Sequence, residues 1–282
     1  MLKVAYSPCP NDTFVFHAWA HGLIPGAPKL DVTYADIDIT NGLAATSNTF
    51  DLLKISYAAL PWMLEDYTLL PCGGALGRGC GPLVLTRDGR PSDSLRTGTI
   101  AVPSERSTAY LLFRLWAAQH VSGGIGRIVV MPFHEIMPAV RDGAVDAGLV
   151  IHEARFTYPR FGLTQLVDLG NWWEADTGLP IPLGAIIARR SLDLKAIARW
   201  TRESVEYAWA HPEASQDYVM QHAQEMDREV AKAHIGLYVN AYTAALGNDG
   251  YHAVESLLGR AAKEGLVPAI NWRQLAEQND NK

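Results

Sequence analysis

Short apolar runs alternate with segments of helical spacing along the first part of the chain, and polar or glycine- and proline-containing turns separate them. The apolar runs predict strands at 3–7, 30–39 and 51–56. The segments between and after them predict helices at 13–21, 40–50 and 57–65. A strand–helix–strand–helix order is typical of a parallel sheet with right-handed crossovers, so we expect an α/β protein.

A second alternation of the same kind follows a glycine-rich segment at 73–81. Its strands are expected at 98–102, 127–130 and 146–151, and its helices at 107–120 and 135–141. Two further strands, 82–86 and 184–189, flank this series, and each leads into a charged break. Beyond the second of them, the chain from 192 onward is predicted to be mostly helical.

Two flanking strands of this kind are what two crossings between two domains would produce. We therefore expect a first α/β domain of residues 1–88 plus 189–282 and an inserted second α/β domain of residues 89–188. A small-molecule site is expected in the cleft between the two domains. By analogy, this arrangement fits a periplasmic-binding-protein-like fold of type II.

A histidine stands where one apolar strand stops. His152 follows the run 147–151, and open α/β sheets bind ligands just outside the carboxyl ends of their strands. Because an imidazole takes up and releases a proton near neutral pH, His152 is a candidate general base, although a structural histidine at a strand end is equally compatible. Glu153 and Arg155 could orient its ring or hold a substrate carboxylate.

Three polar turns follow other predicted strands. Asn11 and Asp12 open the first helix, Ser56 ends the third strand, and Ser107 lies in a hydroxyl-rich turn before a long helix. Each of these side chains could cap a helix. Each could instead contact an anionic ligand together with the helix N-terminus, because free N–H groups and the helix dipole point there. Paired tryptophans at 172–173 suit either an aromatic ligand or the core.

Composition narrows the function classes. The chain has 282 residues, 48% of them hydrophobic, and a formal net charge of −6, so no basic face supports nucleic-acid binding. No run of about 18 apolar residues predicts a membrane span, and no secretory signal is recognisable, so we expect a cytoplasmic protein. Cys9, Cys72 and Cys80 are expected to be reduced thiols. His17 and His21 lack the glutamate of a zinc motif, so no metal is expected.

Five segments carry a family resemblance: SPCPNDTF at 7–14, KISYAA at 54–59, GGALGRG at 73–79, IHEARFTY at 151–158 and VDLG at 167–170. Together, and in this order over nearly the whole chain, they closely resemble the 1,4-dihydroxy-6-naphthoate synthase family of the futalosine route to menaquinone. Chorismate dehydratase of the same pathway shares the fold but differs in these motifs.

The resemblance implies a carbon–carbon lyase that needs no metal or organic cofactor. Its substrate would be cyclic dehypoxanthinyl futalosine, and its products 1,4-dihydroxy-6-naphthoate and dihydroxyacetone. The proton acceptor of the family falls on His152. The substrate-contacting segments of the family fall on Lys54, Ile55 and Ser56 and on Ser107 and Thr108. The turn departs from the family pattern by carrying Ser104 instead of glycine and Ser107 instead of threonine.

Other functions remain compatible with the sequence. A non-catalytic small-carboxylate-binding protein of the same fold, chorismate dehydratase and a ligand-sensing domain of a transcription regulator are the alternatives. The absence of an export signal argues against the first, and the absence of a helix-turn-helix segment before Lys3 argues against the last. The expected partner is a small aromatic carboxylate substrate, with no nucleic acid and no membrane, and the chain is expected to be a monomer or homodimer.

Overall fold

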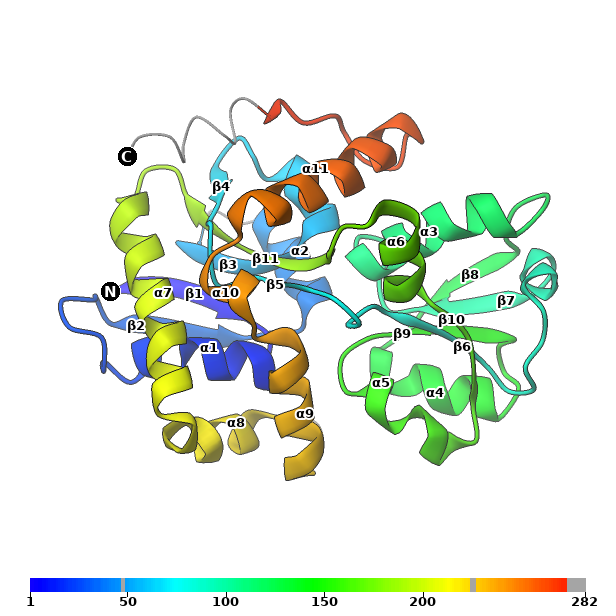
Figure 1. The fold of residues 1–282 in the computed structure, drawn as a ribbon, viewed down its shortest axis with the longest axis horizontal. Helices are drawn as coiled ribbons and strands as arrows, with labels where there is room; N and C mark the ends of the chain where they lie inside the picture. Colours follow the sequence, from blue (N-terminus) through cyan, green and yellow to red (C-terminus); the bar gives the residue numbers. More distant parts are fainter. Residues whose placement is uncertain (47–48, 224–226, 273–282) are drawn as a thin grey trace. The chain divides into compact units, whose positions relative to one another are not determined.

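The computed structural model describes residues 1–46, 49–223 and 227–272. The chain divides into two compact units, each with its own sheet (Figure 1). The first unit comprises Met1–Gly77 and Pro182–Lys282, and the second comprises Arg78–Ile181. Both units mix helices and strands, which confirms the α/β class.

The sheet of the first unit has the strand order β2-β1-β3-β11-β4, and β5 pairs with β11. Its strands are β1 (Leu2–Tyr6), β2 (Leu30–Tyr34), β3 (Leu52–Ser56), β4 (Tyr67–Leu69), β5 (Ala75–Gly77) and β11 (Ile181–Arg189). β1 is parallel to both β2 and β3, whereas β11 runs antiparallel to β3 and β4. All five residues of β3 are buried, as expected for a central strand covered on both faces.

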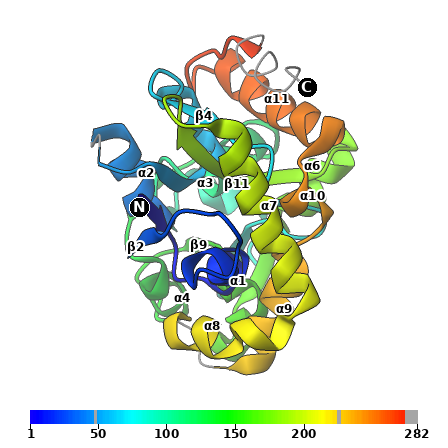
Figure 2. The same cartoon turned by 90° about the vertical axis from the view of Figure 1, so that its left-hand side faces the viewer.

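Helices cover this sheet. α1 (Pro10–Ala20) packs against α7 (Leu194–Ala210), α8 (Gln216–His222) and α9 (Arg228–Tyr238), as Figure 2 shows. Ten of its eleven residues are buried, so α1 forms part of the core rather than a surface helix. The other helical segments are α2 (Ile37–Thr46), a 3-10 helix (Tyr57–Trp62), a 3-10 turn (Pro212–Ser215), α10 (Ala241–Ala244) and α11 (Gly247–Lys263).

The second unit has a sheet of strand order β10-β6-β9-β7-β8. Its strands are β6 (Leu83–Thr86), β7 (Thr99–Val102), β8 (Arg127–Val130), β9 (Ala147–Val150) and β10 (Thr164–Asp168). Its helices are α3 (Thr108–His120), α4 (Phe133–Arg141), α5 (Ala154–Thr157) and α6 (Leu169–Thr177), with 3-10 turns at Ser92–Arg96 and Tyr158–Phe161. β7, β8 and β9 are mutually parallel, and β6 runs antiparallel to β9 and β10.

Two predicted strands lie in the sheet opposite to the one expected. β6 pairs with β9 and β10 in the second unit, although the sequence placed 82–86 in the first domain. β11 pairs with β3 and β4 in the first unit, although most of it was assigned to the inserted domain. The unit boundaries therefore fall at 77/78 and 181/182 rather than at 88/89 and 188/189. An apolar run predicts a strand but does not specify its pairing partner.

The second predicted strand is also shorter than expected. β2 ends at Tyr34, and α2 begins at Ile37, within the range 30–39 that was predicted as a strand. The buried residues of α2 are Thr40, Asn41 and Ala44, a spacing that places them on one face of a helix. Polar and apolar residues alternate up to residue 39, as in a strand, so the pattern predicts a strand beyond the residue where β2 ends.

The paired tryptophans lie on α6, a helix the sequence did not predict. Trp173 is fully buried, and its indole N–H donates to the Pro180 carbonyl oxygen at 3.0 Å, so it packs in the core. Trp172 is more exposed, and its indole N–H donates to Gln119 at 3.3 Å. Among the described residues, no helix is long and apolar enough to cross a bilayer.

A cluster of histidines and tyrosines surrounds Tyr218 of α8. The ring of His17 on α1 is buried and lies 4.5 Å from the ring of His21 and 5.6 Å from that of Tyr218. The hydroxyl of Tyr218 lies 2.7 Å from the hydroxyls of both Tyr6 and Tyr34. Burial, and secondarily His21, lowers the pKa of the His17 imidazole.

This lowered pKa predicts a pH dependence of stability. The unfolded chain binds a proton at His17 at higher pH than the folded chain does, so stability decreases as pH falls from 7 through the ordinary histidine pKa. His17→Phe should weaken this decrease, measured as the urea midpoint at pH 7.5, 6.5 and 5.5. The exposed His134→Phe is the matched control. An unchanged pH slope in His17→Phe would contradict the assignment.

Candidate functional site

The predicted ligand residues of the first unit converge at one edge of its sheet. β1 and β3 are parallel, so the turn after β1 and the end of β3 lie at the same edge. Asp12 follows β1, whereas Lys54 and Ser56 lie on β3. Side chains alternate along a strand, so Lys54 and Ser56 share one face and Ile55 has the opposite face. Ile55 therefore does not join the polar group formed by its neighbours.

Asp12 is the centre of a buried polar network. Its Oδ1 accepts hydrogen bonds from Lys54 Nζ at 2.7 Å and Asn11 Nδ2 at 2.8 Å, and its Oδ2 accepts one from Ser7 Oγ at 2.8 Å. The side chains of both Asp12 and Lys54 are only 3% exposed. Three donors, one of them charged, offset the desolvation cost of this carboxylate. The network makes Asp12 an organiser of the turn after β1.

Neighbouring residues shape this network. Asn41 of α2 donates from Nδ2 to Ser56 Oγ at 3.1 Å and accepts the Ser56 backbone N–H at 2.8 Å. Gly184 of β11 pairs with Ser56, and a Cβ there would lie 2.8 Å from Lys54 Cε. The absence of a side chain at 184 therefore leaves room for the lysine. Asn41 is not among the residues predicted from the sequence, and its only signal is its position on the buried face of α2.

None of the polar residues of this edge caps the helix that follows it. The N-cap of α1 is Cys9, without a side-chain cap hydrogen bond, and Pro10 occupies the first helical position. Asn11 and Asp12 therefore lie inside the first turn. Ser56 precedes the 3-10 helix (Tyr57–Trp62), also without a side-chain cap. The expected 57–65 helix is thus a shorter 3-10 segment.

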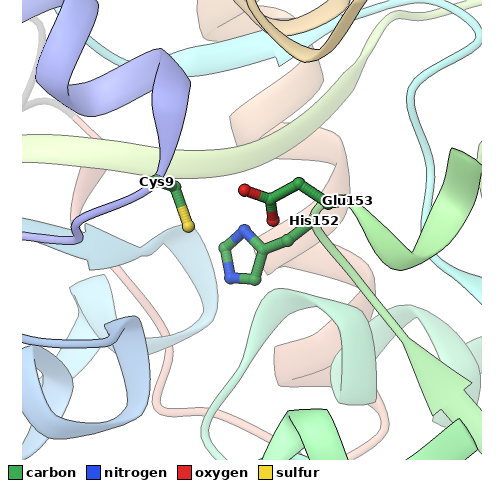
Figure 3. A group of neighbouring side chains, drawn as sticks. All are labelled: Cys9, His152 and Glu153. Atoms are coloured by element: carbon green, nitrogen blue, oxygen red, sulfur yellow. The ribbon is translucent and has the colours of Figure 1, made fainter. Parts of the chain in front are cut away.

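In the second unit, the predicted base His152 also lies at the edge of a sheet, next to the end of a parallel strand. β7 and β9 are parallel, so His152, which follows β9, and the Ser107 turn, which follows β7, lie at one edge of this sheet. The side chain of His152 is partly buried, and Glu153 beside it is 5% exposed (Figure 3). The ring of Phe133 meets the His152 ring edge-on, with centroids 5.6 Å apart.

His152 has an unusual backbone conformation. Its φ of 57° is the one positive value among the described non-glycine residues. For a residue with a side chain, this left-handed conformation costs roughly 1–2 kcal/mol, although histidine tolerates it better than most. The turn then leads into α5, and the Arg155 N–H donates to the His152 carbonyl oxygen at 3.3 Å. Such strain frequently accompanies functional sites.

Ser107 is a helix cap, one of the two roles that its sequence context allowed. Its Oγ accepts the Tyr110 N–H at 3.1 Å and donates to the Ser104 carbonyl oxygen at 2.9 Å. Thr108 is the first residue of α3 and is 2% exposed. A substrate contact by either residue stays a prediction.

A family model described as menaquinone biosynthesis matches residues 2–263. The chain belongs to this menaquinone biosynthesis family. A 1,4-dihydroxy-6-naphthoate synthase of Streptomyces coelicolor is 68% identical over 278 residues, which are 98% of each chain. A synthase of the same name from Thermus thermophilus is 46% identical and covers 94% of this chain and 96% of its own. These relatives confirm the family resemblance found in the sequence.

Solved structures of this fold confirm the expected architecture. A protein of Archaeoglobus fulgidus is 34% identical, with a TM-score of 0.87 over 94% of this chain and 98% of its own. The periplasmic aliphatic sulphonate binding protein of Escherichia coli is 14% identical, with a TM-score of 0.69 over 97% of this chain and 90% of its own. The second likeness concerns the fold alone, which is periplasmic-binding-protein-like in this member of the menaquinone biosynthesis family.

Proposed function

We propose that the chain is a carbon–carbon lyase that converts cyclic dehypoxanthinyl futalosine to 1,4-dihydroxy-6-naphthoate and releases dihydroxyacetone. The observation that carries this proposal is the 68% identity, over 98% of both chains, to the 1,4-dihydroxy-6-naphthoate synthase of Streptomyces coelicolor. The five sequence segments of the family, spread from 7 to 170, support the same assignment.

His152 is the proposed base. Loss of the three-carbon fragment breaks a carbon–carbon bond, and a proton must leave a hydroxyl or a carbon while the remaining ring becomes aromatic. A neutral imidazole accepts that proton, a contribution of about 10²–10⁴ in rate. Aromatisation supplies the driving force, so the protein has to position the substrate and provide the base. The partly exposed ring of His152 at a sheet edge suits this role.

The substrate carboxylate needs hydrogen-bond donors. We assign candidate donor roles to Ser56 in the first unit and, independently, to the Ser107–Thr108 turn in the second. In that turn the N-terminus of α3 is the proposed donor, because the Ser107 hydroxyl already donates to the Ser104 carbonyl oxygen. Asn11 and Lys54 act next to them through the network of Asp12, because Lys54 Nζ and Asn11 Nδ2 already donate to that carboxylate. The side chain of Ile55 is fully buried on the other face of β3, so a substrate contact by this residue would involve its backbone and stays a prediction.

The reaction can be tested directly. Purified protein is incubated with cyclic dehypoxanthinyl futalosine, and mass spectrometry follows the substrate, the dihydroxynaphthoate and dihydroxyacetone, with the Streptomyces coelicolor synthase as the positive control. We expect both products in equal amounts. Substrate returned unchanged would indicate a binding protein, and consumption of chorismate instead would indicate the dehydratase; either result contradicts the proposal. The cytoplasmic location and the monomeric or homodimeric state stay predictions.

A further inference from the structure

The guanidinium of Arg155 is held by two groups that belong to different elements of the second unit. Its Nη1 donates to the Gly81 carbonyl oxygen at 2.7 Å, just before β6. Its Nη2 donates to Asp168 Oδ2 at 2.6 Å, at the end of β10. The Arg155 side chain is 17% exposed and that of Asp168 is 4% exposed. The pair is therefore largely desolvated, and breaking it is costly.

Asp168 connects this ion pair to the start of α6. Its Oδ1 accepts the backbone N–H groups of Gly170 at 2.9 Å and Asn171 at 3.2 Å, which caps the helix. The two backbones are also in close contact, because a Cβ on Gly170 would lie 2.7 Å from the Gly81 nitrogen and a Cβ on Gly81 would collide with Gly170. Arg155 is thus anchored to a closely packed junction where the starts of β6 and α6 meet the end of β10.

The backbone of Arg155 contacts the turn that carries His152. Its N–H donates to the His152 carbonyl oxygen, and Arg155 lies three residues after the histidine. The left-handed conformation of His152 persists only if the surrounding structure holds it. The side chain of Arg155 supplies such an anchor, since it ties the first turn of α5 to the junction at Gly81 and Asp168.

We propose that Arg155 and Asp168 form a positioning clamp that fixes the backbone turn of His152 and thereby aims its imidazole. The clamp residues act through His152, and this inference rests on the proposed function of that histidine. Arg155 is less suited to hold a substrate carboxylate, because Asp168 already neutralises its charge.

The first test compares clamp variants with a matched surface pair. Arg155→Met and Asp168→Asn should lower kcat by about 10²-fold, the effect of a misplaced catalytic group, while KM changes by no more than about twofold. Arg155→Lys should recover only part of the rate, because it keeps the charge but loses the forked geometry. Arg141→Met and Asp142→Asn remove an exposed pair of the same unit and should leave kcat unchanged. Circular dichroism and thermal unfolding verify the fold of each variant.

A double-mutant cycle separates positioning from any independent role. In a His152→Asn background, Arg155→Met should cause no further loss of turnover beyond about twofold, because the group that it positions is already absent. If Arg155→Met lowered kcat in the His152→Asn background by about as much as it does in the chain that retains His152, the clamp would be overturned. Folded Arg155→Met and Arg155→Lys variants with the kcat of the unmodified chain would overturn it as well.

An activity-independent readout distinguishes failure of the clamp from failure of the proposed function. The imidazole signals of His152, assigned by their loss in His152→Asn, are followed by NMR as pH is changed. Arg155→Met should change their chemical shifts and titration midpoint, whereas Arg141→Met should not. Unchanged signals overturn the clamp even if the chain is inactive on the proposed substrate. An inactive unmodified chain overturns the proposed function alone.

Discussion

Replacement of His152 by asparagine is expected to lower kcat for cyclic dehypoxanthinyl futalosine by about 10²–10⁴-fold, the contribution of a positioned general base. Asparagine is the informative substitution because His152 has a φ of 57°, a conformation that asparagine adopts readily. Alanine would add backbone strain at the same position. The asparagine variant therefore separates loss of the imidazole from distortion of the turn.

The measurement is the steady-state rate over a range of substrate concentrations, which gives kcat and KM separately. His134→Asn is the matched control, since His134 lies in the same unit near the start of α4 and its side chain is 70% exposed. The control should retain the full rate. KM of His152→Asn should stay close to that of the unmodified chain, because the base acts on the transition state. Turnover of His152→Asn at the unmodified rate would remove His152 from the proton transfer.

The location of His152 could be predicted from the sequence, but its conformation could not. The apolar run before it indicates a buried strand, and the rule that ligands bind at the carboxyl ends of strands gives the position. β9 ends at Val150, and the next residues form a left-handed turn. A φ value depends on the contacts of the turn, among them the Arg155 N–H, which no local pattern of residue types encodes.

The sequence could not predict which residues far apart along the chain contact one another. Asp12 and Lys54 were each predicted as ligand contacts, but 42 residues separate them, and their ion pair depends on the parallel pairing of β1 with β3. The segment containing Asp168 was recognised by its resemblance alone, and neither β10 nor α6 around it was predicted. Apolar runs predict strands well, whereas the order of strands in a sheet depends on tertiary packing.

The buried ion pair of the first unit leads to the second large effect. Lys54→Met should reduce the free energy of unfolding of the first unit by about 3–5 kcal/mol, because the Asp12 carboxylate loses its counter-charge while it stays buried. Methionine keeps most of the length and apolar volume of the lysine side chain. The loss therefore reports the uncompensated charge rather than a cavity.

Urea unfolding followed by tryptophan fluorescence and circular dichroism measures this loss, with separate transitions fitted if the two units unfold separately. The double variant Lys54→Met with Asp12→Asn should recover part of the stability, since the neutral amide avoids a buried unpaired charge. Its single carbonyl oxygen can still accept from Asn11, and its NH2 group can donate to the Ser7 hydroxyl oxygen. The exposed pair Arg141–Asp142 provides the control, because Arg141→Met breaks an ion pair of similar distance and should leave the transition in place. If Lys54→Met lost as little stability as Arg141→Met, the Asp12 carboxylate would have to be solvated by water in the variant. The network would then not be the buried support of the turn after β1 that the structure indicates.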